Sequence, residues 1–236
     1  MLDVGFDNIT MAEATDKALS AMAGRNAAYV VTPNPEIVML CRSDAALLAA
    51  VNAATLVLPD GIGVIKGAQL LGTPLKEKIP GIEFAENLLG CMAARGLSVF
   101  LLGAKPGVSE LAAEKLAARF DGLKIAGTND GYFTDNTTVI KKINGASPDL
   151  LLVCLGAPKQ EHWMQQNAPL LKVGLMAGLG GAMDVFAGVA ERAPENWRRL
   201  NLEWLYRLKS DPSRAGRMMN LPKFALFVIG RRLFGK

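Results

Sequence analysis

The segment SVFLLGAKPGVSELAAEKLAARF, residues 98–120, decides the fold. It opens with an uninterrupted apolar run, which predicts a strand buried on both faces. A loop with glycine and proline follows, and residues 108–120 then have the spacing of an amphipathic helix. A buried strand that leads through a short loop into a helix is the repeating unit of a parallel α/β sheet.

The same unit recurs along the chain. Helices are predicted over residues 11–22, 82–95, 108–120 and 135–143, the first opened by Thr10 and Glu13 as a capping box. The alternation predicts an α/β fold with a single Rossmann-like, doubly wound, mostly parallel sheet over residues 1–190. Residues 191–236 are predicted to form a basic helical C-terminal appendage. Strands are predicted at residues 28–31, 55–58, 98–102, 123–126, 150–155 and 173–176.

The charge of the chain is concentrated in its last segment. Residues 191–236 contain 11 Lys and Arg against 4 Asp and Glu, a net charge of +7. The whole chain has 26 and 22, so residues 1–190 carry a net charge of −3. Such asymmetry predicts an anionic partner for the C-terminal segment.

Composition narrows the classes of function. The chain of 236 residues has one histidine, His162, which argues against a metal cluster and a Ser-His-Asp triad. Cys41, Cys91 and Cys154 are widely spaced within apolar runs, so we expect three buried thiols and no disulfide framework. The chain begins without a secretion signal, and its apolar runs are too short to span a membrane, so a cytoplasmic location is expected.

Polar residues follow the predicted strands at the edge where ligands bind in such sheets. Asp60 comes directly after an apolar run, where a carboxylate can act as a general base or cap the next helix. Thr32 and Asn34 lie in a TPNP sequence that favours a turn with or without a ligand. Gln160 and Glu161 lie at a predicted helix start, where capping by glutamate is common, so a structural role is equally compatible with the pattern.

The loop at residues 103–107 leads into a helix N-terminus, which suits either a phosphate group or a plain turn. The chain has no D-x-D motif that would hold a magnesium diphosphate. An enzyme without a metal must neutralise a leaving diphosphate with helix dipoles or with arginine and lysine, and the basic appendage supplies that charge.

Eight segments, in this order, resemble the TagA/WecG/CpsF glycosyltransferases, glycosyltransferase family 26. They are TPNPE (32–36), PDGIG (59–63), KIPGIE (78–83), LLGAKPG (101–107), DGYF (130–133), GAPKQE (156–161), GGAMDVFAG (180–188) and RAPxxW…LEWLYRL…PSRxxR (192–217). Each motif is weak alone, but the series covers nearly the whole chain.

The resemblance implies an inverting, metal-independent hexosyltransferase without a cofactor, acting in cell-wall polysaccharide synthesis. It would move an N-acetylmannosamine-type sugar from a UDP-sugar to a polyprenyl-diphosphate-linked N-acetylglucosamine acceptor. Asp60 would be the catalytic base. The resemblance assigns substrate binding to Thr32, Asn34, Lys78, Gln160, Arg207, Arg214 and Arg217, and we assign nucleotide binding to Gly103, Gly107, Gly131, Tyr132 and Asp184.

One motif departs from the family pattern. Many members have arginine and aspartate where this chain has Lys78 and Glu83. Lysine keeps the charge but loses the bidentate geometry of a guanidinium, so a contact with a diphosphate or carboxylate there would be looser. This leaves the donor sugar open.

The appendage is the segment expected to contact a membrane. The resemblance implies that it binds the inner face of the cell membrane peripherally and closes over the active site. We expect Phe224, Phe227, Val228, Leu233 and Phe234 to form the lipid-facing side of an interfacial helix, which argues against nucleic acid as the partner. The alternative function is a nucleotide-binding Rossmann oxidoreductase, suggested by Gly178, Gly180 and Gly181, and the pattern leaves a homo-oligomer open.

Overall fold

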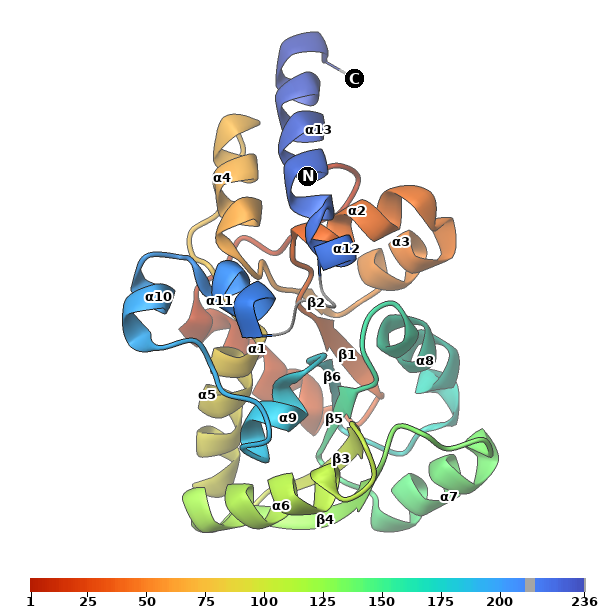
Figure 1. The fold of residues 1–236 in the computed structure, drawn as a ribbon. Coiled ribbons are helices and arrows are strands. Elements are labelled where there is room, and N and C mark those ends of the chain that lie inside the picture. The colour runs from red at the N-terminus through yellow and green to blue at the C-terminus, as the bar shows by residue number, and fades with distance from the viewer. Residues whose placement is uncertain (211–214, 236) are drawn as a thin grey trace.

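The computed structural model describes residues 1–210 and 215–235, except for the side chains of Arg207, Ser210, Ala215 and Arg217. Its strands form one parallel sheet in the order β2-β1-β6-β5-β3-β4, with helices on both faces (Figure 1). The predicted α/β fold with a doubly wound sheet is confirmed. The strands are β1 (Ala28–Val31), β2 (Leu56–Val57), β3 (Ser98–Gly103), β4 (Lys124–Asn129), β5 (Leu150–Cys154) and β6 (Leu175–Gly178).

The helices predicted from periodicity lie within a few residues of their expected bounds. The capping box is confirmed, because the Glu13 amide donates to Thr10 Oγ1 at 3.3 Å and the Thr10 amide donates to Glu13 Oε2 at 2.6 Å. The helices are α1 (Met11–Ala23), α2 (Pro35–Ser43), α3 (Ala45–Asn52), α4 (Ile62–Leu70), α5 (Gly81–Ala93), α6 (Val108–Arg119), α7 (Asn136–Ala146), α8 (Lys159–Asn167), the 3-10 turn η1 (Ala168–Leu170), α9 (Ala182–Phe186), α10 (Glu195–Arg199), α11 (Glu203–Ser210), α12 (Ala215–Met218) and α13 (Asn220–Phe234).

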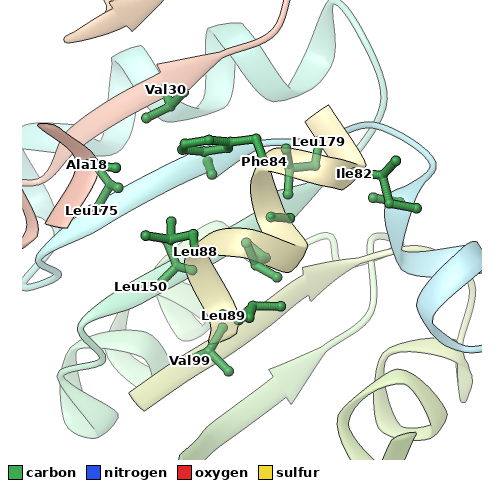
Figure 2. Packing of buried hydrophobic residues seen from close by; sticks show 14 of the residues in the cluster. Ala18, Val30, Ile82, Phe84, Leu88, Leu89, Val99, Leu150, Leu175 and Leu179 are labelled. Atoms are coloured by element: carbon green, nitrogen blue, oxygen red, sulfur yellow. The ribbon is translucent and has the colours of Figure 1, made fainter. Parts of the chain in front are cut away.

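Alternate residues of each strand enter two separate cores. Leu150 and Leu152 face the core covered by α1, α5, α6 and α9, while Leu151 and Val153 face the core covered by α2, α3, α7 and α8. Figure 2 shows Phe84, Leu88 and Leu89 of α5 against the first of these two faces. Because both faces are buried, the strands have no polar alternation, as the sequence indicated.

The cysteines agree only in part with the expectation of three buried thiols. Cys41 and Cys154 are buried, and burial raises the pKa of both thiols to about 12. Cys91 lies in the last turn of α5 and is partly exposed, so the expectation of full burial is wrong for this residue. Its apolar sequence neighbours point into the core, whereas Cys91 lies toward the other side of the helix.

Helix α13 is fixed to the body of the protein along α2 and α4 (Figure 1). Phe224 and Val228 are only 4% and 2% exposed, so the prediction that these two residues face a lipid surface is wrong. They lie one turn apart, on the side of α13 that the second core covers. A methyl group at Gly67 of α4 would lie 3.1 Å from Cζ of Phe224, so glycine permits this close approach.

The rest of α13 leaves large apolar side chains exposed. Phe227, Leu233 and Phe234 are 44%, 69% and 78% exposed. Leu226 and Ile229 are also exposed. Among the described residues, no helix is long and apolar enough to cross a membrane.

Phe224→Ala is expected to destabilise the protein by about 3–5 kcal/mol, because it removes a buried aromatic ring between α13 and α4. Phe227→Ala on the same helix is the matched control and should change stability by less than about 1 kcal/mol. Urea unfolding of both variants measures the difference. A loss for Phe224→Ala as small as the one expected for the control would show that α13 is not anchored through Phe224.

Candidate active site

Four loops converge at the carboxyl edge of the central strands. Thr32 follows β1, Asp60 follows β2, and Gly180 follows β6. Gln160 lies in the first turn of α8, just beyond β5. Since β2, β1, β6 and β5 are consecutive in the sheet, the candidate residues come together at one edge.

Asp60 faces the beginning of α5. Its Oδ2 accepts a hydrogen bond from the Gly81 amide at 3.4 Å, a long and weak contact. The cap position of α4 is Gly61, and it makes no side-chain capping bond, so the interpretation of Asp60 as the cap of that helix is wrong. The N-terminus of α5 instead places partial positive charge next to the Asp60 side chain.

Thr32, just after β1, contacts the end of β6 and the first turn of α5. Its side chain is buried, and Oγ1 donates to the Gly178 carbonyl at the end of β6 at 3.5 Å. A methyl group at Gly81 would lie 2.9 Å from the same Oγ1. Glycine is therefore required where α5 meets the end of β1, and this close approach brings Thr32 beside the helix start that Asp60 contacts.

Gln160 is almost fully buried, at 2% exposure. Its Oε1 accepts a hydrogen bond from the Gly180 amide at 2.9 Å, and its Nε2 donates to Oε1 of Glu161 at 2.8 Å. No side chain caps α8, whose cap residue is Pro158, so a capping role for Gln160 or Glu161 is excluded. Gln160 instead joins α8 to the loop after β6.

Glu161 is a buried carboxyl that sequence reasoning did not single out as a site residue. It is 1% exposed, and burial raises its pKa. The sequence signal for this buried carboxyl was a glutamine next to a glutamate shortly after an apolar strand. Glutamate is rarely buried without a partner, and the adjacent glutamine could supply one.

Asn34 caps α2. Its Oδ1 accepts a hydrogen bond from the Ile37 amide at 3.0 Å. The structural interpretation of the TPNP turn is therefore correct for this oxygen. The amide nitrogen of Asn34 is the group suited to a ligand hydroxyl, because the residue is only partly buried and lies close to Gly61.

A cluster of charged residues ties the chain after α9 to α5. Glu83 in the first turn of α5 forms an ion pair with Arg192 and lies 3.8 Å from Arg198 Nη1. Lys78 Nζ donates to Oδ1 of Asn201 at 3.2 Å. The two positions that depart from the family pattern, Lys78 and Glu83, therefore both contact the segment at residues 192–201. Sequence reasoning missed Arg192, Arg198 and Asn201 as partners.

The glycines assigned to nucleotide binding are of two kinds: some allow close packing within the fold, and one has open space around it. A methyl group at Gly103 would lie 2.3 Å from the Cys154 carbonyl oxygen, so this glycine lets β3 and β5 approach. The Gly131 amide donates to the Ala104 carbonyl at 2.8 Å, which brings the loops after β3 and β4 together. Gly107, in contrast, has a φ of +83°, caps α6 and has open space around it.

Tyr132 and Asp184 flank the same edge. Tyr132 is 67% exposed, and its amide donates to Oδ1 of Asp130. Lys159 Nζ donates to the Gly131 carbonyl at 3.1 Å and so holds the neighbouring loop against the start of α8. Asp184 lies in the first turn of α9 and is partly buried.

The structure describes the backbone, but not the side chain, of two of the three appendage arginines assigned to substrate binding. Arg214 lies outside the described residues. Arg207 belongs to α11 and Arg217 to α12, but their side chains also lie outside the described part of the chain. Within the part that the structure describes, no group of three or more His, Cys, Asp or Glu side chains could hold a metal ion.

Known proteins resemble this chain over its whole length. The model of the Glycosyl transferase WecG/TagA/CpsF family matches residues 1–236. Proteins named N-acetylglucosaminyldiphosphoundecaprenol N-acetyl-beta-D-mannosaminyltransferase from Staphylococcus aureus strains MRSA252, MW2 and NCTC 8325 are each 37% identical over 226 residues. Each match covers 95% of this chain and 89% of the relative.

Gly81→Ala is expected to lower stability by about 1–3 kcal/mol, because the new methyl group meets Thr32 Oγ1 inside the packed edge. Gly145→Ala is the matched control, since this glycine lies in helix α7 with open space around it. The control should be neutral or stabilising by up to about 1 kcal/mol. Thermal unfolding checks both, and a Gly81 variant as stable as the control would contradict the packing argument.

Proposed function

This chain belongs to the WecG/TagA/CpsF family of glycosyl transferases, and from that premise we propose that it moves N-acetylmannosamine from UDP to an N-acetylglucosamine linked to a polyprenyl diphosphate. The name of the relatives supports this acceptor and sugar. The single observation that carries the proposal is Asp60 at the N-terminus of α5, beside buried Thr32. The alternative, a Rossmann oxidoreductase, is not favoured.

Asp60 is the base in the proposed reaction. Its carboxylate takes the proton of the acceptor hydroxyl as that oxygen forms a bond to the anomeric carbon. The bond from the anomeric carbon to the diphosphate oxygen breaks, and its electron pair leaves with UDP. Attack from the face opposite UDP inverts the anomeric configuration.

The leaving diphosphate is the group that the rest of the site must stabilise. The N-terminus of α6 at Gly107 supplies backbone amides in open space. The exposed ring of Tyr132 suits stacking on a base. Lys78 and the assigned Arg207, Arg214 and Arg217 add positive charge, so the proposed reaction needs neither a metal ion nor a cofactor.

The appendage, residues 191–236, is proposed to dock on the cytoplasmic face of a membrane. Five apolar side chains of α13 are exposed on a helix that also carries Lys223, Arg231 and Arg232. Apolar side chains with flanking cations suit an anionic lipid interface. Because α13 is packed on α2 and α4, the same docking would also orient the body toward lipid-linked acceptor. The exposed apolar residues are Leu226, Phe227, Ile229, Leu233 and Phe234.

With UDP-N-acetylmannosamine and a short-chain prenyl-diphosphate N-acetylglucosamine, the protein is expected to release UDP, also in the presence of EDTA. Asp60→Asn should lower kcat by about 10²–10⁴-fold because it removes the proton acceptor. UDP binding, measured by calorimetry, should stay within about twofold of the unchanged protein, since the amide keeps the shape of the side chain.

Asp16→Asn on the exposed side of α1 is the control and should leave turnover unchanged. UDP release by Asp60→Asn at the normal rate would remove Asp60 from the role of base. If the unaltered protein released no UDP from any member of a panel of UDP-sugars, the assigned transfer itself would be refuted.

The triple variant Leu226→Ser, Leu233→Ser, Phe234→Ser should bind phosphatidylglycerol vesicles at least about tenfold more weakly, because it removes apolar area from the lipid-facing side. Vesicle sedimentation at low and high salt measures this, and high salt should weaken binding of the unaltered protein. Leu170→Ser, at an exposed leucine of η1 away from α13, is the control. A loss of the same size in the control would contradict docking through α13.

A further inference from the structure

The buried pair of Gln160 and Glu161 carries an inference about how the sugar pocket is held. The two side chains are 2% and 1% exposed, and they lie in the first turn of α8 at the carboxyl edge of the sheet. The family resemblance matches Gln160 to a residue of the substrate pocket, whereas no role has been assigned to Glu161.

The contacts of Gln160 determine which way its amide faces. The Gly180 backbone amide can only donate, so the atom of Gln160 that lies 2.9 Å from it must be the oxygen. The nitrogen then points to Oε1 of Glu161, at 2.8 Å. In a reversed amide, Nε2 of Gln160 would face the Gly180 N–H, so two donors would oppose each other. Its Oε1 would face Oε1 of Glu161, and two acceptors would oppose each other as long as that Glu161 oxygen carries no proton.

Glu161 has few partners of its own. Oε2 makes no hydrogen bond to the described residues, and no ion pair joins this carboxyl to a side chain that the structure describes. Burial raises the pKa of this carboxyl, whereas the hydrogen bond from Gln160 lowers it. Oε1 accepts the Gln160 hydrogen bond whether or not Oε2 carries a proton.

The amide of Gln160 in turn holds the end of β6. Besides the bond to Gly180, a methyl group at Gly178 would lie 3.3 Å from Nε2 of Gln160. The Gly178 carbonyl accepts from Thr32. A rotation of the Gln160 amide would therefore disturb the loop after β6 and the neighbouring end of β1 together.

We propose that Glu161 is a positioning residue of the transferase: as a hydrogen-bond acceptor it fixes the orientation of the Gln160 amide, and through it the loop at Gly180. Glu161 does not touch the reacting atoms in this assignment. The inference rests on the proposed function, because it takes the Gln160 amide to be part of the sugar pocket.

The test compares two substitutions of Glu161 in the full-length protein. Glu161→Gln keeps a carbonyl oxygen that can accept from Gln160, and its kcat and KM should stay within about threefold of those of the unaltered protein. Glu161→Leu removes the acceptor and leaves the buried Nε2 of Gln160 without this partner, so kcat/KM for the UDP-sugar should fall by at least about tenfold. UDP alone should bind to both variants within about twofold of normal affinity, since the uridine part of the donor is held elsewhere.

A second measurement reports on position directly. Hydrogen exchange of the Gly180 amide should be faster in Glu161→Leu than in Glu161→Gln, because only the latter keeps the Gln160 oxygen in place. Gln166→Leu, at an exposed residue of the same helix, is the control and should change neither turnover nor this exchange.

Normal kcat/KM in folded Glu161→Leu would overturn the proposal, and so would an equal loss in both variants, which would mean that the charge of Glu161 matters rather than its acceptor oxygen. If Glu161→Leu does not fold, Glu161→Gln decides. Turnover within about threefold, with unchanged Gly180 exchange, supports the proposal, and a tenfold loss in a folded protein refutes it. UDP release by the unaltered protein in the same assay separates these outcomes from failure of the proposed transfer.

Discussion

The close approach of α5 to the end of β1 is the constraint on which the site depends. Gly81 allows this approach, because any side chain there would meet the buried Thr32 hydroxyl. The approach sets the first turn of α5 against the loop after β2, and so the Gly81 amide meets Asp60. It also places Glu83 and Lys78 where they hold the chain that follows α9. The absence of a Cβ atom at Gly81 thus allows Asp60, the end of β1 and the start of the appendage to be held around the first turn of α5.

The sequence predicted the layers of the fold well because their signal is local. Continuous apolar strands such as residues 150–154 and the capping box at Thr10 need no knowledge of distant contacts. The place of Asp60 at a strand end could be predicted in the same way. Its contact with Gly81 could not, because two residues far apart in sequence meet there only after the sheet has formed.

One wrong prediction and one choice that the sequence left open have a common physical origin. Helix α13 is apolar on more than one side, so periodicity alone could not say that the body covers Phe224 and Val228 and leaves Phe227 exposed. In the same way, the polar letters Gln160 and Glu161 at a helix start resemble a capping pattern, yet both side chains turn inward. The assembled fold determines which face of a helix is covered. This determined the burial of Phe224 and Val228 as well as that of Gln160 and Glu161.

The attachment of the appendage at two places has a consequence for its arginines. Residues 192–201 are held on α5 through Glu83 and Lys78, and α13 is held on α2 and α4. Arg207, Arg214 and Arg217 therefore belong to a stretch whose two ends are both anchored on the body. Groups tethered in this way meet a bound anion at an effective concentration on the order of millimolar or higher, regardless of how dilute the protein is. In the proposed reaction, these arginines would therefore neutralise the diphosphate in an intramolecular event, governed by the length of the tether rather than by diffusion.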